Sequence, residues 1–289
     1  MIYKNLFEKL LLMKRILFQA RLLDNGCESD AVAAALKVYA EEYEPGKNSA
    51  EVATEVHRAA YEVMKADPYY QMKLDADRIA GEFLDQVTQY VESSEDPFAA
   101  AIRVAVIGNI MDFGVGLAIE RPEQFRDRFQ ALLDQGIGSD DTEKLRQKLK
   151  ESKSILYFFD NCGESQFDKF LIKEIQKMGV RVVGVVRGQA ILNDVTLEDA
   201  QRIGLDKILD RTVSTSIFAI GANLSKAGGD LKEELQKADL ILAKGMANYE
   251  SLSDQDAGIP KAFILRTKCE PVARSLGVPP DINVVRYVA

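Results

Sequence analysis

Apolar residues in the first half of the chain recur at intervals of three and four positions, which is the spacing of amphipathic helices. Asp-Pro pairs and glycines divide this half into segments. The pattern predicts helices over residues 1–23, 29–43, 48–65, 67–92, from 97 onward, 123–133 and 141–151. Residues 1–150 are therefore expected to form a helical N-terminal region.

The pattern changes after residue 150 to short apolar runs that alternate with helical segments. Strands are predicted over 155–159, 181–186, 239–243 and 262–265, with a short strand at 207–209 and an edge strand at 283–288. Helices are predicted from about 165 and over 196–203, 231–237 and 271–276. This alternation predicts an α/β fold, in which the helical region packs on a doubly wound, mostly parallel, Rossmann-like sheet formed by residues 151–289.

The run at residues 155–159 is continuously apolar and aromatic, which is typical of a strand buried on both faces of a parallel sheet. It ends in Asp160 and Asn161, and Gly163 and Glu164 follow just before the predicted helix. Ligands of open α/β sheets bind at the carboxyl ends of strands. A helix N-terminus favours anions, and adjacent oxygen-bearing side chains favour a hard cation. We therefore expect a divalent metal and a phosphate at this position, within residues 151–289.

Polar residues follow four of the predicted strands. They are Asp160 and Asn161, then Arg187 and Asp194, then Lys244 and Asn248, and finally Lys268. Loops at one edge of a parallel sheet collect into a single cleft, so carboxylates and an amide for a cation would be surrounded by lysine and arginine. This layout suits a metal-assisted reaction of a phosphate ester.

Three residues have a structural interpretation beside a functional one. Asp194 is expected to bind the same metal as Asp160 and Asn161, since neighbouring parallel strands lie about 4.8 Å apart. The alternative is that Asp194 only caps the helix that begins near residue 196. Cys162 is either a thiol nucleophile or simply buried. His57, the only histidine, is expected to be a surface or packing residue.

Composition narrows the class of protein. The 289 residues are 47% hydrophobic and 28% charged, as in ordinary globular chains, and the net charge of −8 argues against a nucleic-acid binder. Three widely separated cysteines indicate a reducing compartment without disulfides. The charged N-terminus predicts neither a membrane span nor a targeting segment, so a cytoplasmic location is expected. The oligomeric state is not predicted.

Several motifs in a fixed order resemble those of the damage-control phosphatases, in their compact archaeal and bacterial type. They are Asp67-Pro68-Tyr69, Gly108-Asn109-x-x-Asp112, Asp160-Asn161-x-Gly163-Glu164, Arg187-Gly188 with Asn193-Asp194-Val195-Thr196, Lys244-Gly245-x-x-Asn248-x-Glu250, and Lys268-Cys269-x-Pro271. The resemblance covers most of the chain. It implies a helical region on an α/β sheet and a phosphatase that uses manganese, cobalt, nickel or magnesium. The implied substrates are small phosphorylated metabolites, such as sugar phosphates or damaged phosphometabolites.

The resemblance also assigns residues. Metal ligands are expected at Asp160, Asn161 and Asp194, and Lys244 is expected to hold the phosphate. The helical region would supply Asn109 and Asp112 to the cleft. The expected substrate-binding set is therefore Asn109, Asp112, Arg187, Asn248 and Lys268. Many prokaryotic relatives begin with a paired-cysteine segment, whereas this chain has only Cys27 there.

The expected mechanism is attack of a water on the phosphoryl group, with the water activated by the metal or by an acid such as Asp160 or Glu164. Lys244 would neutralise charge on the other phosphate oxygens. A phosphoryl-aspartate intermediate stays open, although the Asp-x-Asp of the haloacid-dehalogenase phosphatases is absent after this strand. The alternative functions are an adenosylmethionine-dependent carboxyl methyltransferase and a non-catalytic metal- or metabolite-binding protein.

Overall fold

The structure is a computed structural model that describes residues 6–44, 47–111 and 122–289. The first three helices are α1 (Leu6–Leu22), α2 (Glu28–Glu42) and α3 (Ser49–Met64). They lie together at one side of the molecule and share a small apolar core of their own, which includes Ile16, Ala35 and Val56. We call them the three-helix unit.

The next helices cover one side of the sheet. They are α4 (Tyr70–Gly81), α5 (Leu84–Glu92), α6 (Pro97–Gly108), the 3-10 helix η1 (Pro122–Phe125), α7 (Phe129–Gln135) and α8 (Thr142–Glu151). The single helix predicted over 67–92 is wrong, because α4 ends at Gly81 and α5 begins at Leu84. Phe83, between the two helices, packs against Phe125 and Phe129. The helix predicted over 123–133 is likewise split into η1 and α7.

Within the described residues, seven strands form one sheet. They are β1 (Ser139–Asp140), β2 (Ser154–Phe158), β3 (Arg181–Val186), β4 (Arg211–Ser214), β5 (Leu240–Lys244), β6 (Lys261–Arg266) and β7 (Asn283–Val288), in the order β1-β7-β6-β5-β2-β3-β4. All neighbouring pairs are parallel except β6 and β7. The predicted α/β fold with a mostly parallel sheet is confirmed.

Two predictions about strands are wrong. Residues 207–209 lie at and just after a 3-10 turn, η2 (Leu205–Lys207), and the strand follows as β4. Leu205 and Leu209 are buried against the core, so their apolar character serves packing of a turn. β7 is not an edge strand, because the two-residue strand β1 pairs with it through Ser139 and Val284.

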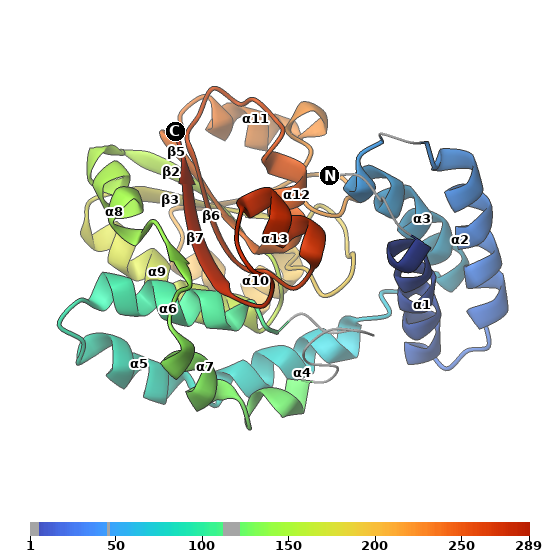
Figure 1. Ribbon diagram of the computed structural model, residues 1–289, viewed down its shortest axis with the longest axis horizontal. Helices are drawn as coiled ribbons and strands as arrows, with labels where there is room; N and C mark the ends of the chain where they lie inside the picture. Colours follow the sequence, from blue (N-terminus) through green and yellow to red (C-terminus); the bar gives the residue numbers. More distant parts are fainter. Residues whose placement is uncertain (1–5, 45–46, 112–121) are drawn as a thin grey trace.

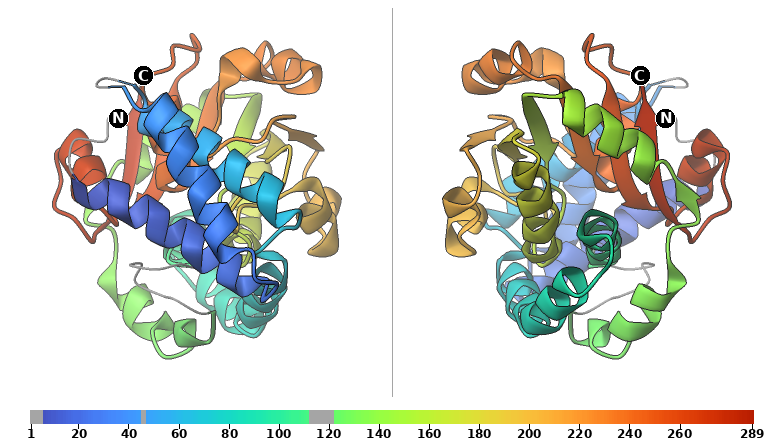
Figure 2. Two further views of the ribbon diagram at one scale, coloured as in Figure 1. Left: turned by 90° about the vertical axis from the view of Figure 1, so that its right-hand side faces the viewer. Right: turned by 90° about the vertical axis from the view of Figure 1, so that its left-hand side faces the viewer.

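Apolar cores cover both faces of the sheet. One face packs against α6, α8, α10 (Leu197–Arg202) and α9 (Glu164–Lys177), the crossover helix between β2 and β3. The other packs against α11 (Gly229–Leu235), α12 (Gly245–Leu252) and α13 (Glu270–Leu276). The two views in Figure 2 show these layers from the two sides. None of the helices in the described ranges is long and apolar enough to cross a membrane.

Candidate functional site

The carboxyl end of β2 is the point from which the chain extends the sheet in both directions. β2 pairs with β3 on one side and with β5 on the other, and Phe158 lies opposite Val185 and Ala243. Continuing these registers by two residues brings Asp160 level with Arg187 and Gly245. Because a switch of winding direction opens a crevice above the strand ends, this is where a doubly wound sheet binds ligands.

The loops after β2 and β3 are joined through their backbones. Asn161 and Asp194 form an isolated antiparallel bridge. Cys162 N–H donates to Asn193 O at 2.8 Å, and Val195 N–H donates to Asp160 O at 2.9 Å. The expected proximity of Asn161 and Asp194 is therefore confirmed.

Asp194 is not the cap of the following helix. The N-cap of α10 is Thr196, which forms a reciprocal capping box with Asp199. The carboxylate of Asp194 instead accepts from Arg187 Nε at 2.5 Å. Asp194 is thus buried at the strand end without a capping role.

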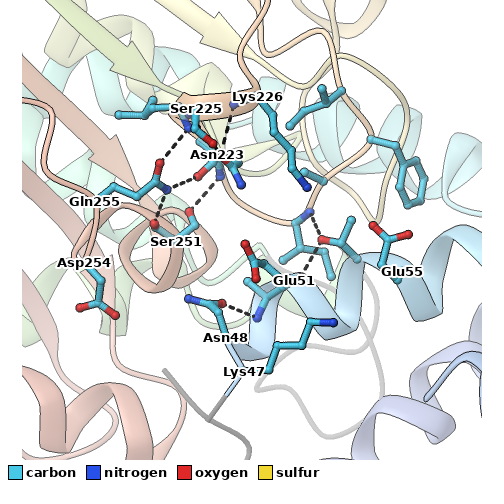
Figure 3. A pocket seen from close by; sticks show the side chains of 18 of the residues that line it. Lys47, Asn48, Glu51, Glu55, Asn223, Ser225, Lys226, Ser251, Asp254 and Gln255 are labelled. Carbon is cyan, nitrogen blue, oxygen red and sulfur yellow. Dashed lines mark hydrogen bonds between the residues drawn. The ribbon is translucent and has the colours of Figure 1, made fainter. Parts of the chain in front are cut away.

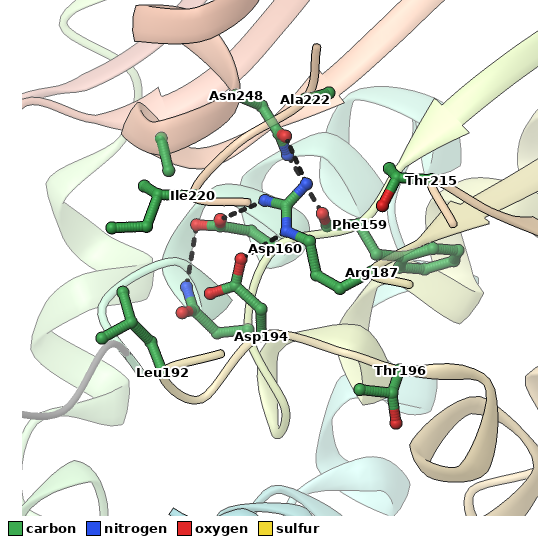
Figure 4. A network of polar contacts seen from close by, with 12 residues as sticks. Phe159, Asp160, Arg187, Leu192, Asp194, Thr196, Thr215, Ile220, Ala222 and Asn248 are labelled. Carbon is green, nitrogen blue, oxygen red and sulfur yellow. Dashed lines mark hydrogen bonds and ion pairs between the residues drawn. The ribbon is translucent and has the colours of Figure 1, made fainter. Parts of the chain in front are cut away.

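Arg187 lies between two carboxylates at the end of β3 (Figure 4). Its Nε donates to Asp194, its Nη2 lies 3.7 Å from Asp160 Oδ1, and its Nη1 donates to Asn248 Oδ1 at 2.9 Å. Nη2 is buried and makes no hydrogen bond with the described residues. Asn248 in turn donates to Phe159 O and Lys244 O, which ties α12 to the ends of β2 and β5.

Lys244 is completely buried beneath this surface. Its ammonium donates to Glu164 Oε1, to Asp168 Oδ1 at 2.7 Å and to Ala105 O at 2.9 Å. Burial lowers the pKa of Lys244, but the carboxylates of Asp168 and Glu164 outweigh that effect and the net shift is upward. The side chain predicted to hold a phosphate therefore faces into the protein, beside Glu164.

Asp168 belongs to the same buried network. Its Oδ1 accepts from Tyr157 Oη at 2.8 Å as well as from Lys244, and its Oδ2 has no hydrogen-bond partner among the described residues. Burial raises the pKa of Asp168 to about 7, against the opposing effect of Lys244 and with a further increase from Glu164. The Asp168 carboxyl therefore changes its protonation near neutral pH.

Asn109, at the end of α6, connects the helical region with the site. Its Nδ2 donates to Asp160 Oδ2 at 3.1 Å and to Glu164 Oε2 at 2.9 Å, while its Oδ1 accepts from Arg266 N–H. The prediction that Asn109 points toward Asp160 is confirmed. Asp112 lies outside the described residues. Lys268 follows β6, and its backbone N–H lies 3.2 Å from Met246 Sδ on α12.

The turn after Asn161 is fixed by a residue that the sequence did not reveal. Asp77 on α4 accepts from Gly163 N–H at 2.7 Å, and its other oxygen accepts from Arg202 at 2.7 Å. Gly163 has φ of +81°, and a Cβ there would lie 2.9 Å from Met111 Cε, so glycine is required. α4 therefore positions the N-terminus of α9 and, with it, Glu164.

Two residues with open interpretations prove to be structural. Burial raises the pKa of Cys162 well above its usual range, so its thiol stays protonated and is a poor nucleophile. His57 is fully buried and contacts Gln19 Oε1 through Nδ1 at 3.1 Å. Burial lowers the pKa of His57 to about 3, which keeps its ring neutral.

The donor set at the strand ends fits a hard divalent cation. In the described ranges no three His, Cys, Asp or Glu side chains group as a metal site by themselves. The carboxylates of Asp160 and Asp194 both lie against Arg187, and the carboxamide of Asn161 donates through Nδ2 to Asp160 Oδ2 at 2.9 Å, so the three side chains lie at one place. Carboxylate and carboxamide oxygens are the ligands preferred by magnesium, and carboxylates also suit manganese.

A pocket of about 890 Å³ lies between α3 and the segment 217–226 (Figure 3). Its walls carry polar side chains, with Asn48, Glu51 and Glu55 from α3 facing Asn223 and Gln255. Ile220 and Ala222 line this pocket and also lie beside the Asp160 and Arg187 network in Figure 4. The pocket therefore borders the candidate site.

Sequence reasoning missed the deeper layer of the site. Asp168, Tyr157 and Asp77 were not predicted because each lies inside a helix or strand. One signal was present for Asp168, which stands four residues after Glu164 and therefore on the same face of α9.

Comparison with known proteins identifies the family. The model of the damage-control phosphatase ARMT1-like domain matches residues 11–284. A damage-control phosphatase of Archaeoglobus fulgidus is 39% identical over 270 residues, which cover 92% of this chain and 93% of that protein. One of Pyrococcus horikoshii is 33% identical over 252 residues, which cover 86% and 85%.

The fold agrees with this result. A crystal structure of a DUF89 family protein from Pyrococcus horikoshii superposes with a TM-score of 0.86 at 28% identity, covering 98% of each chain. The resemblance seen in the motifs is thus confirmed over nearly the whole length. The chain belongs to the damage-control phosphatase family with the ARMT1-like domain.

Proposed function

We propose that this protein hydrolyses small phosphorylated metabolites with the help of a divalent metal ion bound by Asp160, Asn161 and Asp194. The observation that carries the proposal is the convergence of these oxygen donors from two loops at the switch point of the sheet. The relatives named as damage-control phosphatases support phosphatase activity.

The charge of the site supports a bound cation. The contacts described above link four buried carboxyl groups, on Asp160, Glu164, Asp168 and Asp194, with the cationic side chains of Lys244 and Arg187. Two of these carboxyl groups, on Asp160 and Asp194, lie at the strand ends, and a divalent cation bound there would be attracted to both.

The same edge offers groups for a phosphate. α9 and α12 both begin here, and helix N-termini carry partial positive charge. The buried Nη2 of Arg187 has hydrogen-bonding capacity left for an anion oxygen. Manganese, cobalt, nickel or magnesium at the three oxygen ligands would supply Lewis acidity toward a phosphoryl oxygen and would lower the pKa of a bound water.

The acid–base part of the reaction falls to carboxylates. Asp160 and Glu164 share the Nδ2 donors of Asn109 and Asn161, which fix both carboxylates in orientation. The carboxylate of Asp160 or the carboxylate of Glu164 can accept a proton from an attacking water. Lys244 forms an ion pair with Glu164 from below and thereby acts through it.

The neighbouring pocket suggests the organic part of the substrate. Amides, hydroxyls and carboxylates line it, together with the apolar Phe218 and Ile220. Such a lining can hydrogen-bond a hydroxyl-rich group. We therefore propose sugar phosphates, or damaged metabolites of similar size, as the substrates.

The test is hydrolysis of p-nitrophenyl phosphate by purified protein, first stripped with chelator and then supplied with each metal in turn. We expect turnover only after a metal is added. Full turnover by the stripped protein would contradict the metal requirement, and no release of phosphate from this ester or from a panel of phosphorylated metabolites would contradict the phosphatase assignment. Titration with adenosylmethionine serves as the control for a methyltransferase.

A further inference from the structure

The loop that carries Asp194 contains a strained residue. Leu192 has φ of +51°, in the left-handed region that residues with a side chain rarely adopt. Its side chain is buried in a small apolar cluster with Tyr69, Ile191 and Phe218, so it cannot rotate into solvent. Because this conformation is unfavourable by itself, contacts around the loop have to hold it.

One of these contacts comes from the three-helix unit. Leu192 N–H donates to the hydroxyl of Tyr61 on α3 at 3.0 Å. Two residues later, Asp194 N–H donates to Ile191 O at 3.2 Å, which closes a turn around Leu192. The backbone that Tyr61 holds is therefore the backbone that orients the Asp194 carboxylate.

The Tyr61 ring is itself held in place. It packs edge-on against Phe218, with ring centroids 5.4 Å apart, and touches the apolar cluster around Leu192. Burial raises the pKa of Tyr61 well above its ordinary value, so the hydroxyl stays neutral. Tyr61 is thus a fixed acceptor for the Leu192 N–H.

We infer that Tyr61 is a positioning residue, whose hydroxyl holds Leu192 in its left-handed conformation and thereby sets Asp194 for cation binding. The cation is part of the proposed function, whereas the grip of Tyr61 on the loop is independent of it. The three-helix unit, remote in sequence from the sheet, then completes the site that the sheet builds.

The experiment compares Tyr61→Phe with Ser94→Ala. Tyr61→Phe removes the hydroxyl and keeps the ring packing. Ser94 is the control, because its hydroxyl also accepts a backbone N–H, from Asp96 at 3.2 Å, and it precedes α6 at the end opposite Asn109. Hydrogen exchange of the Leu192 amide without metal and manganese affinity by calorimetry are measured for both variants and for the wild type.

Tyr61→Phe should accelerate exchange at Leu192 and weaken manganese binding by about fivefold to tenfold, the effect of losing one hydrogen bond. Ser94→Ala should leave both unchanged. Unaltered exchange and affinity in Tyr61→Phe, or an equal loss in both variants, would overturn the inference. If wild-type protein binds no manganese, the proposed metal site fails, and exchange at Leu192 alone still decides the role of Tyr61 in the loop.

Discussion

Gly245 approaches Asp160 so closely that a Cβ built on Gly245 would lie 1.7 Å from Asp160 Oδ2. Gly245 also has φ of +76°, which a side chain disfavours. Glycine is therefore required at the start of α12, because any side chain there would collide with the Asp160 carboxylate.

Gly245→Ala should displace Asp160 and lower metal affinity and phosphatase activity by at least about tenfold, since a ligand moved by an ångström loses its geometry. The control is Gly258→Ala, because Gly258 has φ of +62° and a Cβ there would meet nothing within 4 Å. This control measures the effect of placing alanine at a positive φ without a steric contact. Equal activity in the two variants would show that the contact with Asp160 is unimportant.

Asp194→Asn should weaken metal binding by about tenfold to a hundredfold, which is the loss of one charge-assisted contact. Without metal the melting temperature should change little, because the amide oxygen can still accept from Arg187. Thr196→Val removes the true cap of α10 and should cost about 1 kcal/mol of stability without changing metal affinity. Unchanged affinity in Asp194→Asn would remove Asp194 from the ligand set.

Lys244→Met should lower the free energy of unfolding by about 3–5 kcal/mol, because it leaves Glu164 and Asp168 buried without their counter-ion. The loss should be smaller at pH 5 than at pH 8, since Asp168, whose pKa is about 7, is protonated at pH 5. Urea unfolding in the presence of chelator measures both values. Lys237→Met, at a half-exposed lysine paired with Glu233, is the control and should have little effect.

Asp168→Asn should change how stability depends on pH. The pKa of Asp168 is about 7 in the folded protein, and 3.8 is the ordinary value. The folded state therefore holds the proton more tightly, and the stability from Asp168 is complete below pH 4 and is lost as the pH rises through 7. The variant should lose less stability over this range than wild type. Asp206→Asn, at an exposed position, should retain the wild-type slope.

Much of the fold could be predicted because local pattern and packing agree. The apolar runs of β2, β3 and β5 stood out from their surroundings, and Asp96-Pro97 marked the start of α6 with Asp96 as its cap. Periodicity failed where distant contacts decide. The helix is interrupted at Phe83, which packs against Phe125 and Phe129. The two-residue strand β1 forms only by pairing with β7, which is far away in the sequence.

The site divides in the same way. The residues at strand ends, Asp160, Asn161 and Asp194, could be predicted to meet because parallel strands align their loops. The orientation of the side chains around these residues could not be predicted. Asp77 holds the Gly163 turn from α4, and Lys244 turns inward toward Asp168, and neither contact leaves a signal in sequence spacing.

The guanidinium of Arg187 occupies the space between Asp160 and Asp194. Any cation that binds both carboxylates must displace the Arg187 side chain from between them. The measured affinity of such a cation therefore includes the cost of breaking the contacts between Arg187 and the two carboxylates. The displaced guanidinium then becomes available to an incoming anion. Metal and phosphate would then bind with positive coupling, each raising the affinity of the other by the same factor.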